Sequence, residues 1–431
     1  MFAGSVCLDG LSGSSGINCS RYDYGDALSH PVICDCFSGG FWLHPRFPCE
    51  PEDVYYRNES EDILVLLSGR VYNKSSLAVA RSLSANLPDP LLISKLFLAD
   101  GPGFAEPLNG DFAIFILRPG RREAFLYRDH IGAMPLAWIT EGNTLTFSTD
   151  ITGLCRSHSR GGSSDTGFLL SWFKYIDYRR TPNPGVRKTE PGHFIHFTPG
   201  GLKCVKYWFP EKINTDRALS YERMITDLGE LLRDSVRIRC DSRFTAGAHV
   251  SGGLDSGVVS ALARREYSLQ EWFPGFSWSP EAIDQSRDKP DERLLVRSAC
   301  TLAGSEPVFS RMDEDLYRHY VSGSYYSQGY FIEDETSDRA VAEGVNLLFS
   351  GWGGDEFIST GHSGIDLDLL RGFRFRLFFR RNPVGNPKKF IRRFLFYVVY
   401  PLLNILPPGS ARGFRRDARY ILRSYARSER G

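Results

Sequence analysis

Two stretches of the sequence combine glycine, serine and aspartate in a way that suits the binding of phosphate groups. The first, Val250–Ser256, reads Val-Ser-Gly-Gly-Leu-Asp-Ser. An apolar run from Phe244 precedes it, and apolar residues with helical spacing follow it at Val258, Val259 and Leu262. This pattern predicts a strand, a tight loop and a helix. Because glycine lets the backbone approach an anion and a helix N-terminus attracts one, we expect a phosphate-binding loop.

Within this loop, each residue type suggests its own contribution. Gly252 and Gly253 leave room for the anion, and Ser251 and Ser256 supply hydroxyl donors. Asp255 is the exception, because a carboxylate repels phosphates unless a cation lies between them, and we interpret it as a Mg²⁺ ligand. The simpler alternative is an ordinary turn between a strand and a helix. No Walker-type sequence, G-x-x-x-x-G-K-[ST], occurs in the chain.

The second stretch, Leu347–Glu356, reads Leu-Leu-Phe-Ser-Gly-Trp-Gly-Gly-Asp-Glu. An apolar run again opens into small residues, and it ends with two adjacent carboxylates, Asp355 and Glu356. Two carboxylates in one loop repel each other, so an ion that neutralises them is expected. The alternative for Asp355 is an aspartate that only caps a turn.

Both stretches resemble the nucleotide site of one enzyme family. Val250–Ser256 is similar to the pyrophosphate-binding loop of the ATP pyrophosphatases, Ser-Gly-Gly-x-Asp-Ser, and in particular to that of the asparagine synthetase family. Leu347–Glu356 resembles the Ser-Gly-x-Gly-x-Asp-Glu of the same family. These enzymes cleave ATP between the α and β phosphates and activate a carboxylate as its acyl-adenylate. The resemblance therefore implies ATP and Mg²⁺ as cofactors.

The resemblance also implies roles for individual residues. Asp255 and Asp355 would bind Mg²⁺ together, and Glu356 would contact the metal or the substrate. Lys388, or its neighbour Lys389, would stabilise the leaving pyrophosphate. The other nucleotide contacts that the resemblance implies are Val250, Ser251, Gly252, Gly253, Ser256, Ser277, Gly351 and Trp352.

The N-terminal part of the chain alternates short β-like runs with Gly, Pro, Asn and Asp turns, which predicts a layered α+β domain. Four of its segments resemble, in family order, landmarks of the class II glutamine amidotransferase domain: Leu67–Asn73, Asn109–Ala113, Arg128–Gly132 and Leu145–Ile151. We therefore expect a degenerate amidotransferase-like domain over residues 1–210, folded as an Ntn-hydrolase-like sandwich.

Residues 215–431 predict a different architecture. An amphipathic helical pattern over Tyr221–Val236 leads into the first apolar run, and a second strand is expected at Glu271–Ser277. Alternation of strands with helices predicts an α/β doubly wound parallel sheet with its ligands at the carboxyl ends of the strands. The resemblance identifies this segment as an asparagine synthetase-like ATP-pyrophosphatase domain with a basic C-terminal tail.

Two departures from the family narrow the chemistry. Glutamine-hydrolysing members carry a nucleophilic cysteine after the initiator methionine, but this chain has Phe2, and Cys7 is internal. Ser68-Gly69 stands where the family has Asn-Gly oxyanion donors, so we predict no glutaminase activity. Trp352 occupies a position where asparagine synthetases carry Glu and β-lactam synthetases carry Tyr, and an indole cannot serve as a base.

These features together resemble the lasso peptide cyclases, or macrolactam synthetases. That resemblance implies that ATP activates an Asp or Glu side chain of a precursor peptide, and that the N-terminal amine of the peptide closes an isopeptide bond. It also implies a leader-binding protein and a leader peptidase as partners. The aromatic Tyr325–Phe331 and the acidic Glu333–Glu335 are candidate cavity linings, although for the acidic run we favour a solvated loop. The competing functions are an ammonia-dependent asparagine synthetase and a non-catalytic scaffold.

Composition agrees with a globular enzyme. Apolar residues make up 42% and charged residues 24%, and the net charge is +1. The segment after Arg371 is strongly basic, with Asp417 and Glu429 as its acidic residues, so it could face pyrophosphate, an acidic peptide, an anionic membrane or solvent. We expect no nucleic-acid partner and do not favour membrane association. The 9 cysteines lack paired spacing and no signal peptide is evident, which predicts a cytoplasmic protein.

Overall fold

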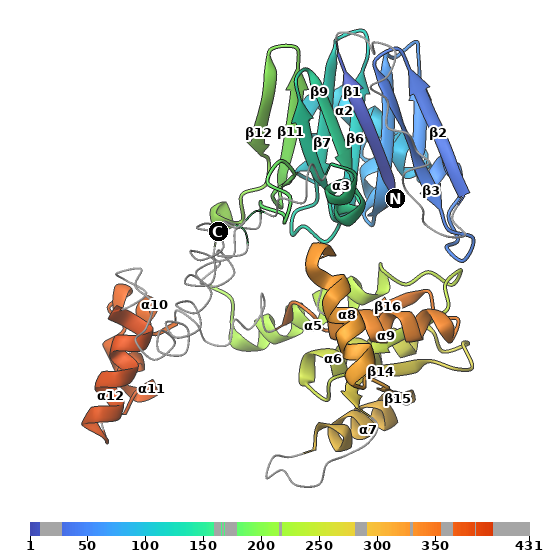
Figure 1. The fold of residues 1–431 in the computed structure, drawn as a ribbon. Helices are drawn as coiled ribbons and strands as arrows, with labels where there is room; N and C mark the ends of the chain where they lie inside the picture. Colours follow the sequence, from blue (N-terminus) through green and yellow to red (C-terminus); the bar gives the residue numbers. More distant parts are fainter. Residues whose placement is uncertain are drawn as a thin grey trace, which may run out of the picture. The chain divides into compact units, whose positions relative to one another are not determined.

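The computed structural model describes most of the chain (Figure 1). The described residues are 1–8, 28–158, 165, 168, 179–214, 218–280, 291–327, 331–354, 365–383 and 385–399. The chain divides into two compact units, of which the first extends to Ser350 and the second holds the residues from Gly351 onward. In the described residues, no helix is both long and apolar enough to span a membrane. The domain boundaries at residues 210 and 215 stay predictions.

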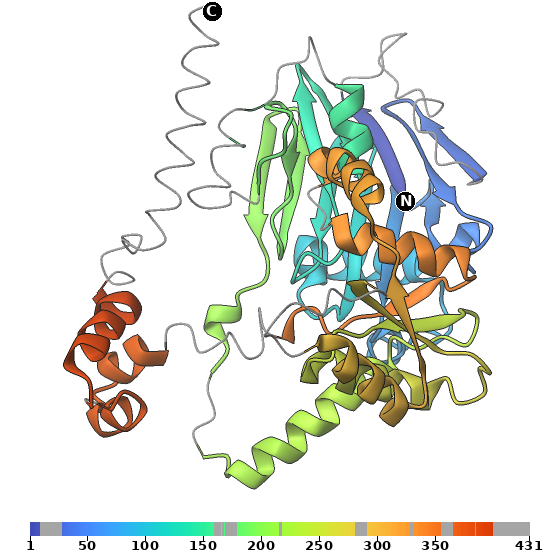
Figure 2. The same cartoon turned by 60° about the horizontal axis from the view of Figure 1, so that its bottom comes forward.

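Two antiparallel sheets form the N-terminal part of the first unit (Figures 1 and 2). The strands of one sheet are β1 (Phe2–Cys7), β2 (Leu28–Cys34), β3 (Phe37–Leu43), β8 (Ala137–Glu141), β9 (Thr144–Ser148) and β10 (Arg187–Lys188). Those of the other are β4 (Tyr55–Asn58), β5 (Ile63–Val71), β6 (Gly110–Arg118), β7 (Glu123–Arg128), β11 (His193–Thr198) and β12 (Gly201–Lys206). Their orders are β10-β8-β9-β1-β3-β2 and β12-β11-β7-β6-β5-β4.

The two sheets share one core because side chains alternate along each strand. From β5, Leu64 packs with Phe2 and Phe147 of the facing sheet. Its neighbour Val65 points the other way and packs with residues of helix α2 (Asp89–Asp100). Helix α3 (Ile151–Ser157) packs against β8 in a further cluster. The predicted layered α+β sandwich is thus confirmed.

A four-stranded parallel sheet forms the rest of the first unit. Its strands are β13 (Ala246–His249), β14 (Pro274–Pro280), β15 (Glu306–Ser310) and β16 (Leu347–Phe349). Helices alternate with them: α5 (Tyr221–Arg237), α6 (Leu254–Glu266), α7 (Glu292–Ala303), α8 (Glu314–Ser327) and α9 (Phe331–Ala342). The order β15-β14-β13-β16 is that of a doubly wound sheet, as predicted. The strand expected at Glu271–Ser277 begins later, at Pro274.

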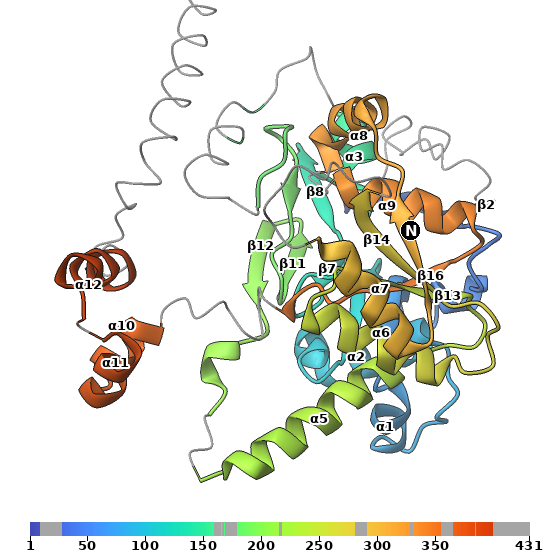
Figure 3. The same cartoon turned by 90° about the horizontal axis from the view of Figure 1, so that it is seen from below.

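Helices cover both faces of this sheet (Figure 3). Helices α6 and α7 pack side by side and bury Ala263, Val296 and Cys300 against β13 and its neighbours. On the opposite face, α9 packs on β14, where Ala340 meets Phe276. Apolar residues therefore enclose the sheet on both sides, which leaves its ends as the places where a ligand reaches it.

Short helices make up the described part of the second unit. They are α10 (Ile365–Arg371), α11 (Phe375–Arg381), α12 (Pro387–Phe394) and a π-helical turn, Leu395–Val399. Phe378 forms the buried centre of this unit and contacts the rings of Phe390 and Phe394 edge to face. Lys388, Arg392 and Arg393 of α12 are exposed.

Candidate functional site

The first predicted motif lies where the strand order of the parallel sheet reverses. From β13 the chain steps outward to β14 and β15, and it then returns to the other side of β13 as β16. Ala248 of β13 pairs with Gly275 of β14 on one side and with Phe349 of β16 on the other. In doubly wound sheets the crevice for ligands opens at the carboxyl ends of such strands. The loop after β13 occupies that position.

The loop backbone needs glycine at position 252. Gly252 has a φ of +79°, a conformation that side chains disfavour. A Cβ atom there would lie 2.7 Å from Cβ of Leu295 and 3.3 Å from the carbonyl oxygen of Glu292, both on α7. Gly253 then caps α6 with extended backbone. The two glycines therefore bring the loop against α7 and turn the chain directly into the helix.

Two serine hydroxyls close the loop on itself. The Oγ atoms of Ser251 and Ser256 lie 3.0 Å apart, and the amide of Ser251 donates to Ser256 Oγ over 3.1 Å. Ser251 Oγ also accepts from the amide of Gly253 at 3.3 Å. Ser256 is buried beneath the loop, whereas Gly253 is exposed. These bonds hold the two hydroxyls at one place, next to the N-terminus of α6.

The first turn of α6 offers both attraction for an anion and a ligand for a cation. Its early amide groups lack partners within the helix, and the helix dipole places positive charge at this end. Asp255 lies in this turn with an exposed side chain. The glycine-lined backbone, the hydroxyls and the helix end fit a pyrophosphate group. Asp255 fits a Mg²⁺ ion bound to that group, because hard cations prefer carboxylate oxygen.

A complete metal site is not present among the residues that the structure describes, since no three His, Cys, Asp or Glu side chains cluster there. Asp355 and Glu356 lie outside the described residues. The pairing of Asp255 with Asp355 on one Mg²⁺ ion therefore stays a prediction.

Val250 and Ser277 connect the loop to the neighbouring strand. The amide of Val250, which is buried, donates to the carbonyl of Phe276 over 2.7 Å. Ser277 follows in β14, is also buried, and accepts from the amide of Ser279 at 3.3 Å. The structure therefore brings the predicted nucleotide edge beside the predicted phosphate loop.

The other predicted residues belong to the second unit. The amide of Gly354 donates to the carbonyl of Gly351 over 3.1 Å, and Gly353 has a φ of +96°, so the second motif begins with a tight turn. Trp352 in this turn is 65% exposed. Lys388 is exposed on α12. The roles of Gly351, Trp352 and Lys388 at the nucleotide stay predictions.

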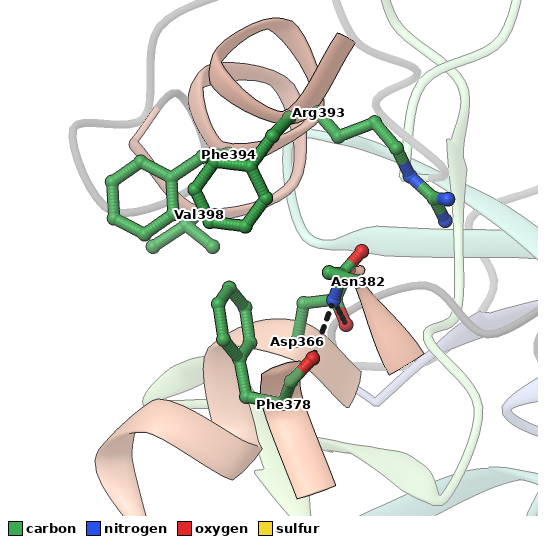
Figure 4. Close-up of a pocket in the computed structure, with 7 residues that line it drawn as sticks. Asp366, Phe378, Asn382, Arg393, Phe394 and Val398 are labelled. Carbon is green, nitrogen blue, oxygen red and sulfur yellow. Dashed lines mark hydrogen bonds between the residues drawn. The ribbon is translucent and has the colours of Figure 1, made fainter. Parts of the chain in front are cut away.

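A small pocket in the second unit contains none of the predicted site residues (Figure 4). Its walls are Asp366, Phe378, Asn382, Phe390, Arg393, Phe394 and Val398. The amide nitrogen of Asn382 donates to Asp366 over 2.9 Å and to the carbonyl of Phe378 over 3.2 Å. This pocket is part of the packing of the helices and adds nothing to the nucleotide site.

Sequence reasoning missed His249, the last residue of β13. Burial lowers the pKa of its imidazole, so the ring is neutral near pH 7. Its Nε2 is buried and has no hydrogen-bond partner among the residues that the structure describes. The ring of Trp278 lies 6.3 Å away, edge to face. The position of His249 directly before Val250 was the available signal.

The acidic run Glu333–Glu335 differs from the expected solvated loop. It forms the first turn of α9, where acidic residues favour the helix dipole. Glu335 is buried and accepts hydrogen bonds from Ser310 Oγ at 2.7 Å and from the amide of Arg311 at 3.1 Å. Glu335 therefore fixes α9 to the end of β15. The side chains of Tyr325–Phe331 lie outside the described residues.

Comparison with known protein families gives two matches that agree with these two architectures. Residues 55–208 match the glutamine amidotransferase domain, and residues 227–407 match the asparagine synthase family. The first match covers most of the layered sandwich, and the second covers the parallel sheet with its loop and continues into the second unit.

Curated relatives point the same way. The chain is 26% identical over 327 residues to asparagine synthetase [glutamine-hydrolyzing] 2 of Bacillus subtilis, an alignment that covers 70% of this chain and 43% of that protein. It is 25% identical to the putative asparagine synthetase [glutamine-hydrolyzing] 2 of Methanocaldococcus jannaschii, with 52% and 45% covered. Amidase chry2 of Gibberella zeae is 24% identical, with 73% and 50% covered. The chain thus spans half or less of the length of these relatives.

Among solved structures, the glutamine phosphoribosylpyrophosphate amidotransferase from Bacillus subtilis, complexed with ADP and GMP, is similar with a TM-score of 0.30 and 12% identity. The alignment covers 61% of this chain and 56% of that one. The fold assignment rests on the observed sheet orders rather than on this score.

Proposed function

Because its two matched segments give this chain the domain pair of the asparagine synthetase family, we propose that it forms an amide bond in an ATP-dependent reaction. A carboxylate is adenylated, pyrophosphate leaves, and an amine displaces AMP from the acyl-adenylate. The observation that carries this proposal is the loop Ser251–Ser256 at the switch point of the parallel sheet. That loop provides a cradle for pyrophosphate and an exposed carboxylate beside it.

Each part of the loop has a role in this scheme. The amides at Gly252, Gly253 and the start of α6, with the hydroxyls of Ser251 and Ser256, bind the pyrophosphate oxygens. Asp255 would hold Mg²⁺, which when bound neutralises charge on the phosphates as the bond between the α and β phosphates breaks. Under this proposal, Val250 and Ser277 contact the nucleotide, and Gly351 and Trp352 lie beside it. Asp355 and Glu356 contact the metal, and Lys388 contacts the leaving pyrophosphate.

The first domain does not support glutamine as the source of the amine. Phe2 is fully buried in the core between the two sheets, where its ring contacts that of Phe147 at 6.0 Å. An aromatic side chain at this position supplies no nucleophile. Cys7, at the end of β1, is partly buried and is internal in the sequence, so it has no free α-amine. An amine other than glutamine-derived ammonia must therefore reach the adenylate.

We propose a precursor peptide as the substrate, with its own N-terminal amine as the nucleophile. An isopeptide macrolactam forms when that amine attacks an adenylated Asp or Glu side chain of the same peptide, as in the lasso peptide cyclases. Holding both groups in one pocket replaces much of the entropic part of the barrier. The sequence at Trp352 supports a reaction other than that of an ordinary asparagine synthetase, because indole supplies no base. A leader-binding protein and a leader peptidase are the proposed partners.

The test compares acceptors in the presence of Mg²⁺-ATP. AMP and pyrophosphate release are measured with a synthetic peptide that carries a free N-terminal amine and an internal Asp or Glu, and separately with aspartate plus ammonium. Peptide-dependent AMP release supports the cyclase. Asparagine formation from aspartate and ammonium would instead support an ammonia-dependent synthetase.

Asp255→Asn examines the site itself. We expect it to reduce AMP release by at least about a hundredfold, because one neutralised metal ligand weakens transition-state charge stabilisation by several kcal/mol. The matched control is Asp35→Asn, an exposed carboxylate in the β2–β3 turn. Equal AMP release from wild type and Asp255→Asn would exclude Asp255 from the reaction, and absence of AMP release from the wild type would leave a non-catalytic scaffold as the better explanation.

A further inference from the structure

We propose that contacts from the N-terminal domain fix the segment before β13 and the carboxyl end of α6. These contacts would position the nucleotide loop, which lies between that strand and that helix. This inference rests on the proposed function, because it assigns the loop to nucleotide binding. It gives the domain a mechanical role that does not require glutaminase chemistry. Two sets of contacts within the first unit carry it, and both reach the amino end of β13.

The first set runs from Arg70 of β5 to the turn before β13. Arg70 Nη1 lies 2.6 Å from Asp241 Oδ2, and its guanidinium carbon lies 4.9 Å from the ring centre of Phe244. Asp241 is largely buried and is also bound by Arg243. Although burial alone would raise the pKa of Asp241, hydrogen bonds from Arg243 and Arg70 lower it below its usual range. The carboxylate therefore stays charged and paired.

Asp241 also connects to the far end of α6. The hydroxyl of Tyr267, the residue after this helix, donates to the carbonyl of Asp241 and accepts from its amide, both over 2.9 Å. The strand, the loop and the helix thus form a closed unit whose two ends meet at Asp241. Arg70 of the N-terminal domain binds the carboxylate of Asp241 at that point.

The second set fixes the amino ends of β13 and of its neighbour β16. Asn346, directly before β16, accepts from the amide of Thr245 over 2.8 Å and donates its own amide to the carbonyl of Thr245 over 3.0 Å. Its side-chain nitrogen donates to the carbonyl of Arg46 over 2.7 Å. Phe47, from the same segment of the N-terminal domain, contacts the ring of Phe244 edge to face at 5.1 Å.

A third contact widens the interface beyond these two points. Arg239 lies 3.5 Å from Asp111 of β6 and stacks over the ring of Tyr72 at 4.5 Å. The hydroxyl of Tyr72 donates to the other oxygen of Asp111 over 2.7 Å. The N-terminal domain therefore presents arginine, aspartate and aromatic groups that complement those of the segment before β13.

These contacts bear on the loop because β13 is short. Only the four residues of Ala246–His249 separate the contacted segment before β13 from Val250 and the loop. A displacement at the base cannot be absorbed by so short a strand, which is paired on both sides. Loss of the ion pair between Arg70 and Asp241 should therefore make the loop more mobile without removing any residue that contacts nucleotide.

The experiment compares nucleotide binding and loop mobility in the full chain with and without the ion pair between Arg70 and Asp241. The variants are Arg70→Ala, Asp241→Asn and the double variant; Asn at 241 can still accept from the amide of Arg243. The control is Arg57→Ala on β4, because Arg57 pairs with Glu59 in the same domain and is as exposed as Arg70, 37% against 34%. Two quantities are measured: the dissociation constant of Mg²⁺-ATP, and hydrogen exchange of the backbone amides of residues 246–257.

We expect each single variant to weaken Mg²⁺-ATP binding roughly fivefold to tenfold and to speed exchange over residues 246–257, because the two residues act as one coupled pair. The double variant should lose no more than the worse single variant, and Arg70→Lys should recover part of the affinity. Arg57→Ala should match wild type in both measurements.

Unchanged affinity and unchanged exchange in this segment, even with a lower midpoint of thermal unfolding, would overturn the positioning role. Additive losses in the double variant would overturn the coupling between Arg70 and Asp241. Absence of Mg²⁺-ATP binding by the wild-type protein would count against the proposed function alone, and the exchange data would then decide the positioning role without nucleotide.

Discussion

Gly252 is the loop residue whose replacement has the clearest structural consequence. We expect Gly252→Ala to lower the free energy of unfolding by about 2–4 kcal/mol, from the positive φ and from overpacking against Leu295. Urea denaturation measures this change, and calorimetry with Mg²⁺-ATP measures the expected loss of affinity. The loop cannot keep its backbone path and accept a Cβ atom at the same time.

Gly257, five residues later in α6, is the matched control. A Cβ atom there would meet nothing within 4 Å in the described part of the chain, and the residue lies inside the helix. Gly257→Ala should therefore raise the free energy of unfolding by about 0.5–1 kcal/mol, since alanine favours the helix. If both variants behaved alike, steric crowding at Gly252 would not be the cause.

His249 makes stability depend on pH. Burial lowers the pKa of its imidazole in the folded state, whereas the unfolded chain has the ordinary pKa of about 6.5. Below that pH the unfolded chain binds a proton that the folded chain resists, so stability falls as the pH falls. We expect His249→Gln to flatten the dependence between pH 7 and pH 5 by up to about 1.4 kcal/mol per pH unit.

The measurement for His249 is the free energy of unfolding across that pH range for wild type and variant. Burial also lowers the pKa of His130 and His196, so a residual slope should remain in the variant. An unchanged slope would mean that the imidazole of His249 titrates normally in the folded protein.

At the scale of elements, the strand β13 and the helix α6 act as one unit because Tyr267 joins their ends. Tyr267→Phe removes both hydrogen bonds to the backbone of Asp241 and takes away the partner of its amide, while its carbonyl still accepts from the amide of Phe244 over 3.0 Å. We expect a loss of about 1–3 kcal/mol in the free energy of unfolding, measured by urea denaturation. Tyr221→Phe is the control, because Tyr221 is 70% exposed at the start of α5. Equal stability of the two variants would exclude this role for the hydroxyl.

The elements themselves were largely predictable from the sequence. Helical spacing predicted Tyr221–Val236, and α5 spans Tyr221–Arg237. The strand expected over Glu271–Ser277 begins only at Pro274, because apolar character does not mark where pairing with a neighbour starts. Glu335 was misread for a related reason: its partner Ser310 lies 25 residues away, and local acidity alone suggests solvent.

At the scale of the molecule, what could be predicted was local and what could not was distant. The loop Val250–Ser256 has its signal within seven consecutive residues, and the structure gives it the predicted strand, turn and helix. The pair of Arg70 with Asp241 joins residues 171 positions apart. No sequence pattern around either residue predicts the other as its partner, so the pair becomes visible only in the folded chain.

The division of work between the two domains gives the last prediction, which is that the protein releases no glutamate from glutamine. The physical reason is Phe2, whose side chain is fully buried between the sheets and offers no nucleophilic atom. The measurement is glutamate produced from L-glutamine, with and without Mg²⁺-ATP, beside an active class II amidotransferase as the positive control. Glutamate above the level without enzyme would contradict the prediction.

Phe2→Cys separates loss of the nucleophile from loss of the whole site. Replacing the buried ring leaves a cavity beside Phe147, so the variant should lose about 2–4 kcal/mol of unfolding free energy. It should gain no glutaminase activity, because Ser68 stands where the resembled family has the Asn of its Asn-Gly oxyanion donors. Glutamate release by Phe2→Cys would instead show that a working site needs only its thiol, and that the domain kept the rest of the amidotransferase machinery.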